Sequence, residues 1–260
     1  MARICPLCSG SSGNSTYISF GSGAILVDAG ASCKALLAAV DEVGSVDALR
    51  AIAITHEHID HIKGLKTLLK KVKVPLVASS GTLSAIREAD LLPAGAEVIV
   101  ADGGETELGG IVLSRFATSH DTEDSSGYTV SDGTTKIAVC TDLGYVTDEV
   151  REALSGSDAV LLESNHDVEM LKRGPYPPQL KLRILSERGH LSNNACAEEL
   201  PQLLKGGATR IILGHLSMHN NTPLLAAAAA RAALADIGAK EGLDYILKVA
   251  KPGISEAVTL

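Results

Sequence analysis

The segment from Thr55 to His61 concentrates four potential metal ligands, and it strongly limits what the chain can fold into. It follows the apolar run LRAIAITH, which predicts a strand, and precedes GLKTLLKKVK, whose leucines share one face of a predicted helix. A loop after a strand can point alternate side chains into one cleft. Imidazole and carboxylate groups together suit Zn²⁺, Fe²⁺ or Mn²⁺. We therefore expect a metal site where this strand ends.

The spacing H-x-H-x-D-H suits two ions better than one. His56 and His58 lie two residues apart and can face one ion. Asp60 and His61 can then reach a second ion about 3.5 to 4 Å away from the first. The alternative, a chance cluster of surface histidines, explains poorly why four potential ligands fall within six residues. The motif predicts a binuclear, metal-dependent hydrolase.

The order of predicted elements indicates an α/β fold. STYISFGSGAILVDAG predicts a hairpin whose second strand ends at Asp28, the middle of the chain is rich in predicted strands, and the last third alternates strands with helices. Two halves of this kind predict two sheets packed face to face with helices outside, an αββα four-layer sandwich. No linker interrupts the chain, so residues 1–260 are expected to form a single domain.

Composition excludes several classes of protein. Apolar residues make up 45% and charged residues 21%, which excludes a disordered chain. The net charge of −8 argues against a non-specific polyanion binder, unless positive charge is concentrated locally or supplied by metal. The start shows no signal peptide, no membrane-spanning run occurs, and five cysteines do not describe a disulfide framework. We expect a cytoplasmic protein without a membrane partner; the sequence does not indicate its oligomeric state.

The motif from His56 to His61 resembles the signature of the metallo-β-lactamase superfamily. Later motifs of that superfamily are met in order at His120, Asp142 and His215. The resemblance implies the metallo-β-lactamase fold and two divalent metal ions, with Zn²⁺ expected first and Mn²⁺ or Fe²⁺ as alternatives. The implied ligands are His56, His58 and His120 for one ion, Asp60, His61 and His215 for the other, and Asp142 as the bridge.

All these residues follow apolar runs, so strands would present them together at one edge of the sandwich. Asp28, which ends the run AILVD, is expected to orient a ligating histidine rather than bind metal itself. Other acids and histidines lie in loops or beyond strand ends and are weaker ligand candidates. They are Asp121, Asp124, Asp132, His166 and His219.

The segment Gly189 to Ser192 resembles the additional histidine motif of ribonuclease Z-like nucleases. There the histidine contacts the scissile phosphate or protonates the leaving oxygen, so the resemblance implies a catalytic role for His190 beside Asp60. A histidine with a structural hydrogen bond at a helix start is the alternative. Ser192 or Asn193 is expected to cap the next helix. Ser192 is also a candidate substrate-binding residue.

Several segments narrow the resemblance to the YycJ/WalJ branch of bacterial metallo-β-lactamase fold proteins. They are SGSSGNST, THEHIDHIKGL, SHDTEDSSGY, LLESNHD and LGHLSMHNN. The branch implies a metal-dependent nuclease, a 5′ to 3′ exonuclease of double-stranded DNA connected with mismatch repair. In the mechanism we expect, a hydroxide bridging two ions attacks phosphorus and His190 assists the leaving oxygen. Asn14 is a candidate phosphate contact. The chain departs from the branch pattern at Cys5 and Cys8.

Two basic segments flank predicted ligands in sequence, one from Lys63 to Lys73 and one from Lys172 to Arg188. They allow a polyanion to bind despite the acidic total, although solvated helix faces explain them equally well. Aromatic residues make up only 3% of the chain, which favours a protein that contacts the nucleic-acid backbone rather than stacked bases. The alternatives are a hydrolase of a small lactone, thioester or cyclic phosphodiester, and a non-catalytic metal-binding regulatory module.

Overall fold

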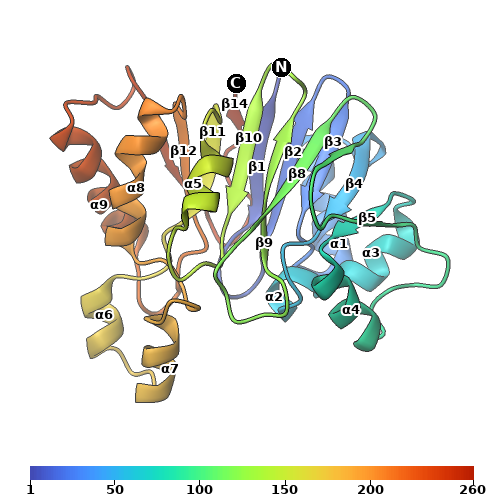
Figure 1. Cartoon of the computed structure of the whole chain (residues 1–260), viewed down its shortest axis with the longest axis horizontal. Helices are drawn as coiled ribbons and strands as arrows, with labels where there is room; N and C mark the ends of the chain where they lie inside the picture. The colour runs from blue at the N-terminus through green and yellow to red at the C-terminus, as the bar shows by residue number, and fades with distance from the viewer.

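In the computed structural model, which describes residues 1–260, two seven-stranded sheets pack face to face and helices cover both outer faces (Figure 1). The αββα sandwich predicted from the sequence is confirmed. Three apolar clusters of 22 buried residues each fill the three interfaces between the four layers. One cluster lies between the sheets, and each of the other two lies between a sheet and its helices. That all 260 residues form one domain stays a prediction.

The first sheet runs in the order β14-β1-β2-β3-β4-β5-β6. Its first four strands pair antiparallel, whereas β3 to β6 are parallel. The strands are β1 (Arg3–Cys8), β2 (Ser15–Phe20), β3 (Gly23–Val27), β4 (Leu49–Ala53), β5 (Leu76–Ala78), β6 (Val98–Val100) and β14 (Val258–Thr259). The helical elements of this half are α1 (Cys33–Val43), η1 (Val46–Ala48), α2 (Ile59–Ile62), α3 (Leu65–Lys71) and α4 (Ser80–Glu88).

The second sheet runs in the order β13-β12-β11-β10-β9-β8-β7. Strands β7 to β10 pair antiparallel and β10 to β13 are parallel. The strands are β7 (Glu105–Glu107), β8 (Val112–Ala117), β9 (Ser126–Ser131), β10 (Lys136–Cys140), β11 (Ala159–Glu163), β12 (Arg210–Gly214) and β13 (Ile246–Val249). The helices are α5 (Asp148–Leu154), α6 (Val168–Arg173), α7 (Pro178–Ile184), α8 (Asn193–Lys205) and α9 (Pro223–Asp236).

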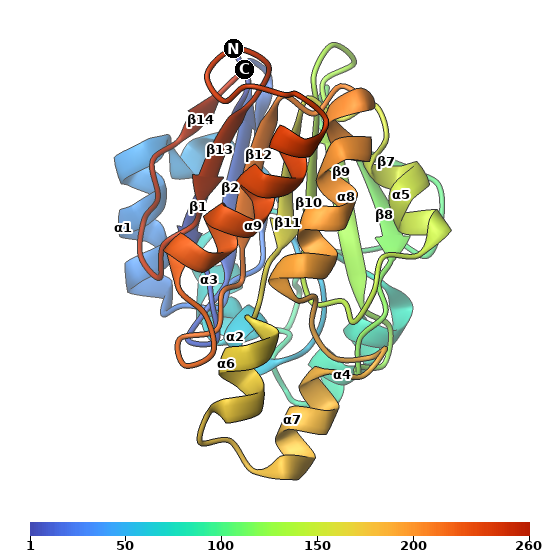
Figure 2. The same cartoon turned by 90° about the vertical axis from the view of Figure 1, so that its left-hand side faces the viewer.

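Helices α6 and α7 differ from the other helices in position. They project beyond one end of the sheets, below α8 in Figure 2, whereas α5, α8 and α9 lie along the outer face of the second sheet. None of the helices is both long enough and apolar enough to cross a membrane. The cavity described below opens beside α7, and this helix and the loop before it form part of its wall.

Local sequence signals explain most of the element boundaries. The predicted hairpin is confirmed, because β2 and β3 pair antiparallel and β3 ends one residue before Asp28. The hydroxyl of Ser192 accepts a hydrogen bond from Ala195 N, which confirms Ser192 as the cap of α8. Strand β1 is not predicted, because RICPLC shows no alternation and contains a proline. Cys5 and Cys8 lie on this strand as buried free thiols.

Tyr128 connects the two sheets close to the metal-binding segment. Its fully buried hydroxyl, on β9, donates a 2.8 Å hydrogen bond to the carbonyl oxygen of Ile54, just after β4. Replacing Tyr128 with Phe leaves this buried carbonyl without that donor. We expect Tyr128→Phe to lower the free energy of unfolding in urea by about 1–3 kcal/mol. Tyr145→Phe is the control, since Tyr145 is 46% exposed; equal stability of the two variants would contradict this role.

Candidate metal centre

Strand direction brings the predicted ligands together. Strands β3, β4, β8, β10, β11 and β12 all end at the same edge of the sandwich, because β3 and β4 are parallel, β10 to β12 are parallel, and β8 and β10 are both antiparallel to β9. Each is followed or ended by a polar side chain of the site. These side chains are Asp28, His56, His120, Asp142, Glu163 and His215.

The backbone is under strain at three of these positions. Only four non-glycine residues in the chain have a positive φ, and three of them are Asp28 (65°), Asp142 (60°) and His215 (54°). A left-handed conformation costs free energy for a residue with a Cβ atom, and residues held in it concentrate at functional sites. Here the conformation turns the chain sharply at the strand end, so that the side chain reaches the shared cavity.

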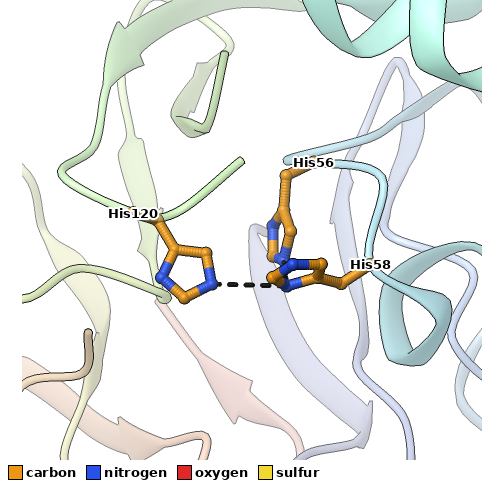
Figure 3. A group of neighbouring side chains, drawn as sticks. All are labelled: His56, His58 and His120. Atoms are coloured by element: carbon orange, nitrogen blue, oxygen red, sulfur yellow. Dashed lines mark hydrogen bonds between the residues drawn. The ribbon is translucent and has the colours of Figure 1, made fainter. Parts of the chain in front are cut away.

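His56, His58 and His120 form one group of facing nitrogens (Figure 3). Nδ1 of His58 lies 3.1 Å from Nε2 of His56 and 3.3 Å from Nε2 of His120. His56 and His58 come from the segment after β4, and His120 comes from the segment after β8 in the other sheet. The group therefore bridges the two sheets at their shared edge.

Asp60, His61 and His215 form a second group beside the first. Oδ2 of Asp60 lies 3.6 Å from Nε2 of His61 and 3.6 Å from Nε2 of His215. The Asp142 carboxylate adjoins both groups: Oδ2 lies 3.3 Å from Nε2 of His61, and Oδ1 lies 3.8 Å from Nε2 of His120. The structure thus places all seven predicted ligands around one point, with Asp142 between the two groups.

The outer nitrogens of these rings are engaged by hydrogen-bond acceptors. Nδ1 of His61 contacts Oδ2 of Asp28 at 2.8 Å, so Asp28 lies behind this ring; that it orients a metal ligand stays a prediction. Nδ1 of His120 contacts the carbonyl of Gly189 at 3.0 Å, and Nδ1 of His215 contacts Oε1 of Glu163 at 2.8 Å. An acceptor at the outer nitrogen requires the proton there, so the lone pair of Nε2 points inward.

Glu163 is the important site residue that the sequence does not predict. It is fully buried at the end of β11, and its Oε1 contacts Nδ1 of both His190, at 2.9 Å, and His215. Its Oε2 accepts hydrogen bonds from the backbone of Leu143 and Leu191. The available signal is a single acid closing the apolar run AVLLE, the same pattern that marks Asp28 and Asp142.

Asn14 and Ser192, the two predicted substrate-binding residues, lie outside the lining of the cavity that is described below. Nδ2 of Asn14 is buried and contacts Oδ2 of Asp60 at 3.2 Å and Nε2 of His61 at 3.1 Å. The hydroxyl of Ser192 caps α8, and neither residue is part of the cavity lining. The two residues thus contact the metal-binding segment and a helix end, respectively; that they bind substrate stays a prediction.

A cavity of about 360 Å³ opens over the two groups. His58, Asp60, His120, Asp142 and His215 contribute to its lining. His190 also lines the cavity; its catalytic role stays a prediction. The outer rim carries Ser11, Ile59, Tyr176, Leu180 and Arg183, of which the last three belong to the α6–α7 region.

The set of donor atoms fits divalent cations. Imidazole lone pairs face one another in the first group, and Oδ2 of Asp142 is buried without a hydrogen-bond partner. Buried polar atoms of this kind are costly unless another group satisfies them. Imidazole and carboxylate donors in this number are typical ligands of Zn²⁺, Mn²⁺ and Fe²⁺.

Comparison with known proteins places this geometry in a family. A family model described as a β-lactamase superfamily domain matches residues 24–216. Exodeoxyribonuclease WalJ of Streptococcus pneumoniae is 36% identical over 259 residues, which cover 97% of this chain and 96% of that protein. Exodeoxyribonuclease YycJ of Bacillus anthracis is 37% identical over 222 residues, 85% of this chain and 84% of that one.

The chain belongs to the YycJ/WalJ-like branch of the metallo-β-lactamase superfamily. Solved structures agree on the fold. The metallo-β-lactamase fold protein YhfI of Bacillus subtilis matches with a TM-score of 0.71 at 18% identity, covering 99% of this chain and 98% of that one. Zn²⁺-bound PqqB of Methylobacterium extorquens matches with a TM-score of 0.71 at 18% identity, covering 99% and 100%. The family and the clustered histidine and aspartate donors together support binding of divalent metal at this site.

Protonation in the metallo-β-lactamase-like site follows from burial and charge. Burial, reinforced by His61, lowers the pKa of His56 well below its usual value, and burial followed by His120 lowers that of His58. Both rings are therefore neutral at pH 7, as metal ligation requires. Burial acts to lower the pKa of His61, but the carboxylates of Asp28 and Asp142 outweigh it and raise the pKa to about 9. Without a cation this ring therefore carries a second proton at pH 7, and a metal ion that binds in the same negative field would displace that proton from Nε2.

Asp28 provides a test of ring orientation. Asn tolerates the positive φ of this position but cannot match a carboxylate as an acceptor for Nδ1 of His61. We expect Asp28→Asn to weaken Zn²⁺ affinity about 10–100-fold, measured by competition with a chelating dye. Asp90→Asn is the matched control, since exposed Asp90 also has a positive φ of 54°. Wild-type affinity in Asp28→Asn would show that Asp28 does not orient the ligand.

Proposed function

We propose that this protein is a metal-dependent phosphodiesterase that removes nucleotides from the 5′ end of double-stranded DNA. The observation that carries the proposal is the agreement of two facts. The chain aligns over 97% of its length with a relative named as an exodeoxyribonuclease. It also keeps a complete set of metal-binding donors together with an additional histidine, His190, on the wall of the same cavity.

Two divalent ions are part of the proposal, with Zn²⁺ as the first candidate and Mn²⁺ or Fe²⁺ as alternatives. His56, His58 and His120 would hold one ion, and Asp60, His61 and His215 would hold the other, with Asp142 shared between them. When bound, the ions would supply positive charge at the phosphate and increase the acidity of water. The crowded donor set supports this, because Asp142 adjoins both groups.

The proposed acid is His190. Its Nδ1 is held by Oε1 of buried Glu163 at 2.9 Å, which leaves Nε2 without a protein partner. Burial acts to lower the pKa of His190, but the Glu163 carboxylate outweighs burial and raises it. The raised pKa favours the protonated ring, which can give the proton on Nε2 to the oxygen that leaves the phosphorus. Glu163 positions the ring through Nδ1.

Binding of the backbone rather than of the bases fits the cavity lining. Tyr176 is the only Phe, Tyr or Trp residue that lines it, and the other lining groups are mostly polar or charged. A nuclease that digests any sequence needs contacts to phosphate and sugar, which are the same at each nucleotide. A cytoplasmic location also belongs to the proposal; five buried free cysteines support it.

The leaving group distinguishes the role of His190 from a purely structural one. The sugar oxygen of DNA needs a proton as it leaves, whereas p-nitrophenolate leaves without one. We expect His190→Gln to lower kcat on duplex DNA about 10²–10⁴-fold. Turnover of bis(p-nitrophenyl) phosphate should fall by clearly less than about a hundredfold, which marks the lower end of this range.

Asp60→Ala is the companion variant in these assays. It removes a donor of the second metal group, so we expect it to abolish turnover of both substrates while the protein remains folded by circular dichroism. Asp41→Ala, on the exposed face of α1, is the matched control. Equal losses on DNA and on bis(p-nitrophenyl) phosphate in His190→Gln would rule out the acid role. If the wild-type enzyme cleaved lactones or thioesters but no nucleic acid, the proposed function would be wrong.

A further inference from the structure

The two basic segments of the sequence differ in how they are used by the fold. The second segment, from Lys172 to Arg188, is engaged almost entirely in internal contacts. Lys172 and Arg173 both pair with Glu169 on the same helix. Arg183 pairs with Asp121. The Arg183–Asp121 pair connects α7 to the cavity wall. All three ion pairs leave few cations of this segment available to a ligand.

The remaining cations of this segment donate hydrogen bonds to backbone carbonyls. Nζ of Lys181 donates to the carbonyls of Lys172 and Gly174, at 2.7 and 2.6 Å. The guanidinium of Arg188 donates to the carbonyl of His120 at 3.1 and 3.2 Å. Arg188 therefore holds the segment that carries His120 in place. The second segment is best explained by its structural contacts.

In the first segment, from Lys63 to Lys73, most cations make no internal contact. Lys63, Lys70, Lys71 and Lys73 are all exposed, and none forms an ion pair or a side-chain hydrogen bond within the protein. Lys66 alone is paired, with Asp90 at 2.7 Å. No acidic residue occurs between Lys63 and Lys73, although the whole chain has 31 acidic and 23 basic residues. Four unpaired cations thus gather on one short stretch of an acidic protein.

Local helix energetics explain only part of this stretch. Cations near a helix C-terminus interact favourably with the helix dipole, which accounts for Lys70 and Lys71 on α3 and applies also to Lys63, the C-cap residue of the short α2. It does not account for Lys73, which lies beyond the end of α3. Lys66 and Lys70 are four residues apart, a spacing at which like charges repel and weaken a helix. A solvated helix face normally mixes both signs of charge to avoid this.

In sequence, the lysines directly follow the metal-binding segment. Lys63 immediately follows α2, the short helix that carries Asp60 and His61, and α3 begins two residues later. Figure 1 shows α3 beside α2, on the side of the first sheet that faces away from the second.

We propose that Lys63, Lys70, Lys71 and Lys73 form a lysine ridge that binds the phosphate backbone of the duplex part of the substrate while its end lies in the metal cavity. This rests on the proposed function and adds to it the surface of the protein that holds the duplex beyond the cavity. Unpaired cations next to the site, in a chain of net charge −8, are complementary to a polyanion that approaches from this side only.

The salt dependence of substrate binding tests the lysine ridge. In the metal-loaded protein, Lys63, Lys70, Lys71 and Lys73 are replaced together by Gln, and KM for a long duplex is measured over a range of salt concentrations. The slope of log KM against log salt should fall by about three to four, since each lost phosphate contact contributes about 0.9. The duplex KM at low salt should rise at least tenfold, with kcat unchanged.

Matched variants make the outcome decisive. Four lysines elsewhere, also exposed and without ion pairs, form the control when changed to Gln: Lys34, Lys205, Lys240 and Lys251. A double variant, Lys63→Gln with Lys73→Gln, leaves α3 itself unchanged and should lower the slope by about two. A slope in the ridge variant equal to that of the control would overturn the inference, as would an equal effect on single-stranded DNA. Turnover of bis(p-nitrophenyl) phosphate by the ridge variant should equal that of the wild-type protein. A wild-type protein that cleaved neither this substrate nor DNA would refute the proposed function instead.

Discussion

The whole site depends on strands that end together at one edge of the sandwich. Parallel pairing within each sheet, and the packing of the sheets by their apolar faces, bring residues as distant as Asp28 and His215 to a common point. No local element could do this, since the short α2 supplies only Asp60 and His61. The positive φ values at Asp28, Asp142 and His215 are the local cost of turning the chain at that edge.

Once the strand ends meet, buried charge decides the chemistry. Each inward-facing ring is fixed from behind: Asp28 holds His61, and Glu163 holds both His190 and His215. These acids keep the lone pairs of His61 and His215 directed at the centre and give it a negative field that favours cations. The same Glu163 raises the pKa of His190. One buried carboxylate thus connects the metal-binding residues with the proposed proton donor.

Much of this could be predicted from the sequence, because the informative residues follow a rule of position. A polar residue that closes an apolar run lies at a strand end, and this rule, together with the family resemblance, locates His120, Asp142 and His215. Glu163 obeys the same rule and lies within LLESNHD, one of the segments that resemble the branch, but the sequence assigns it no role; its importance follows only from contacts with residues 27 and 52 positions away. The different use of the two basic segments is also invisible in sequence, since it depends on which carbonyls and acids the fold brings near each lysine and arginine.

The most direct test of the account is digestion of one duplex, labelled at the 5′ end or at the 3′ end, by protein of measured metal content. The account predicts about two divalent ions per chain, early release of the 5′ label as mononucleotide, and gradual shortening of the 3′-labelled strand. Loss of both effects on removal of metal by a chelator, and their return when metal is added back, is part of the prediction. Intact duplex in the presence of two bound ions per chain would contradict it.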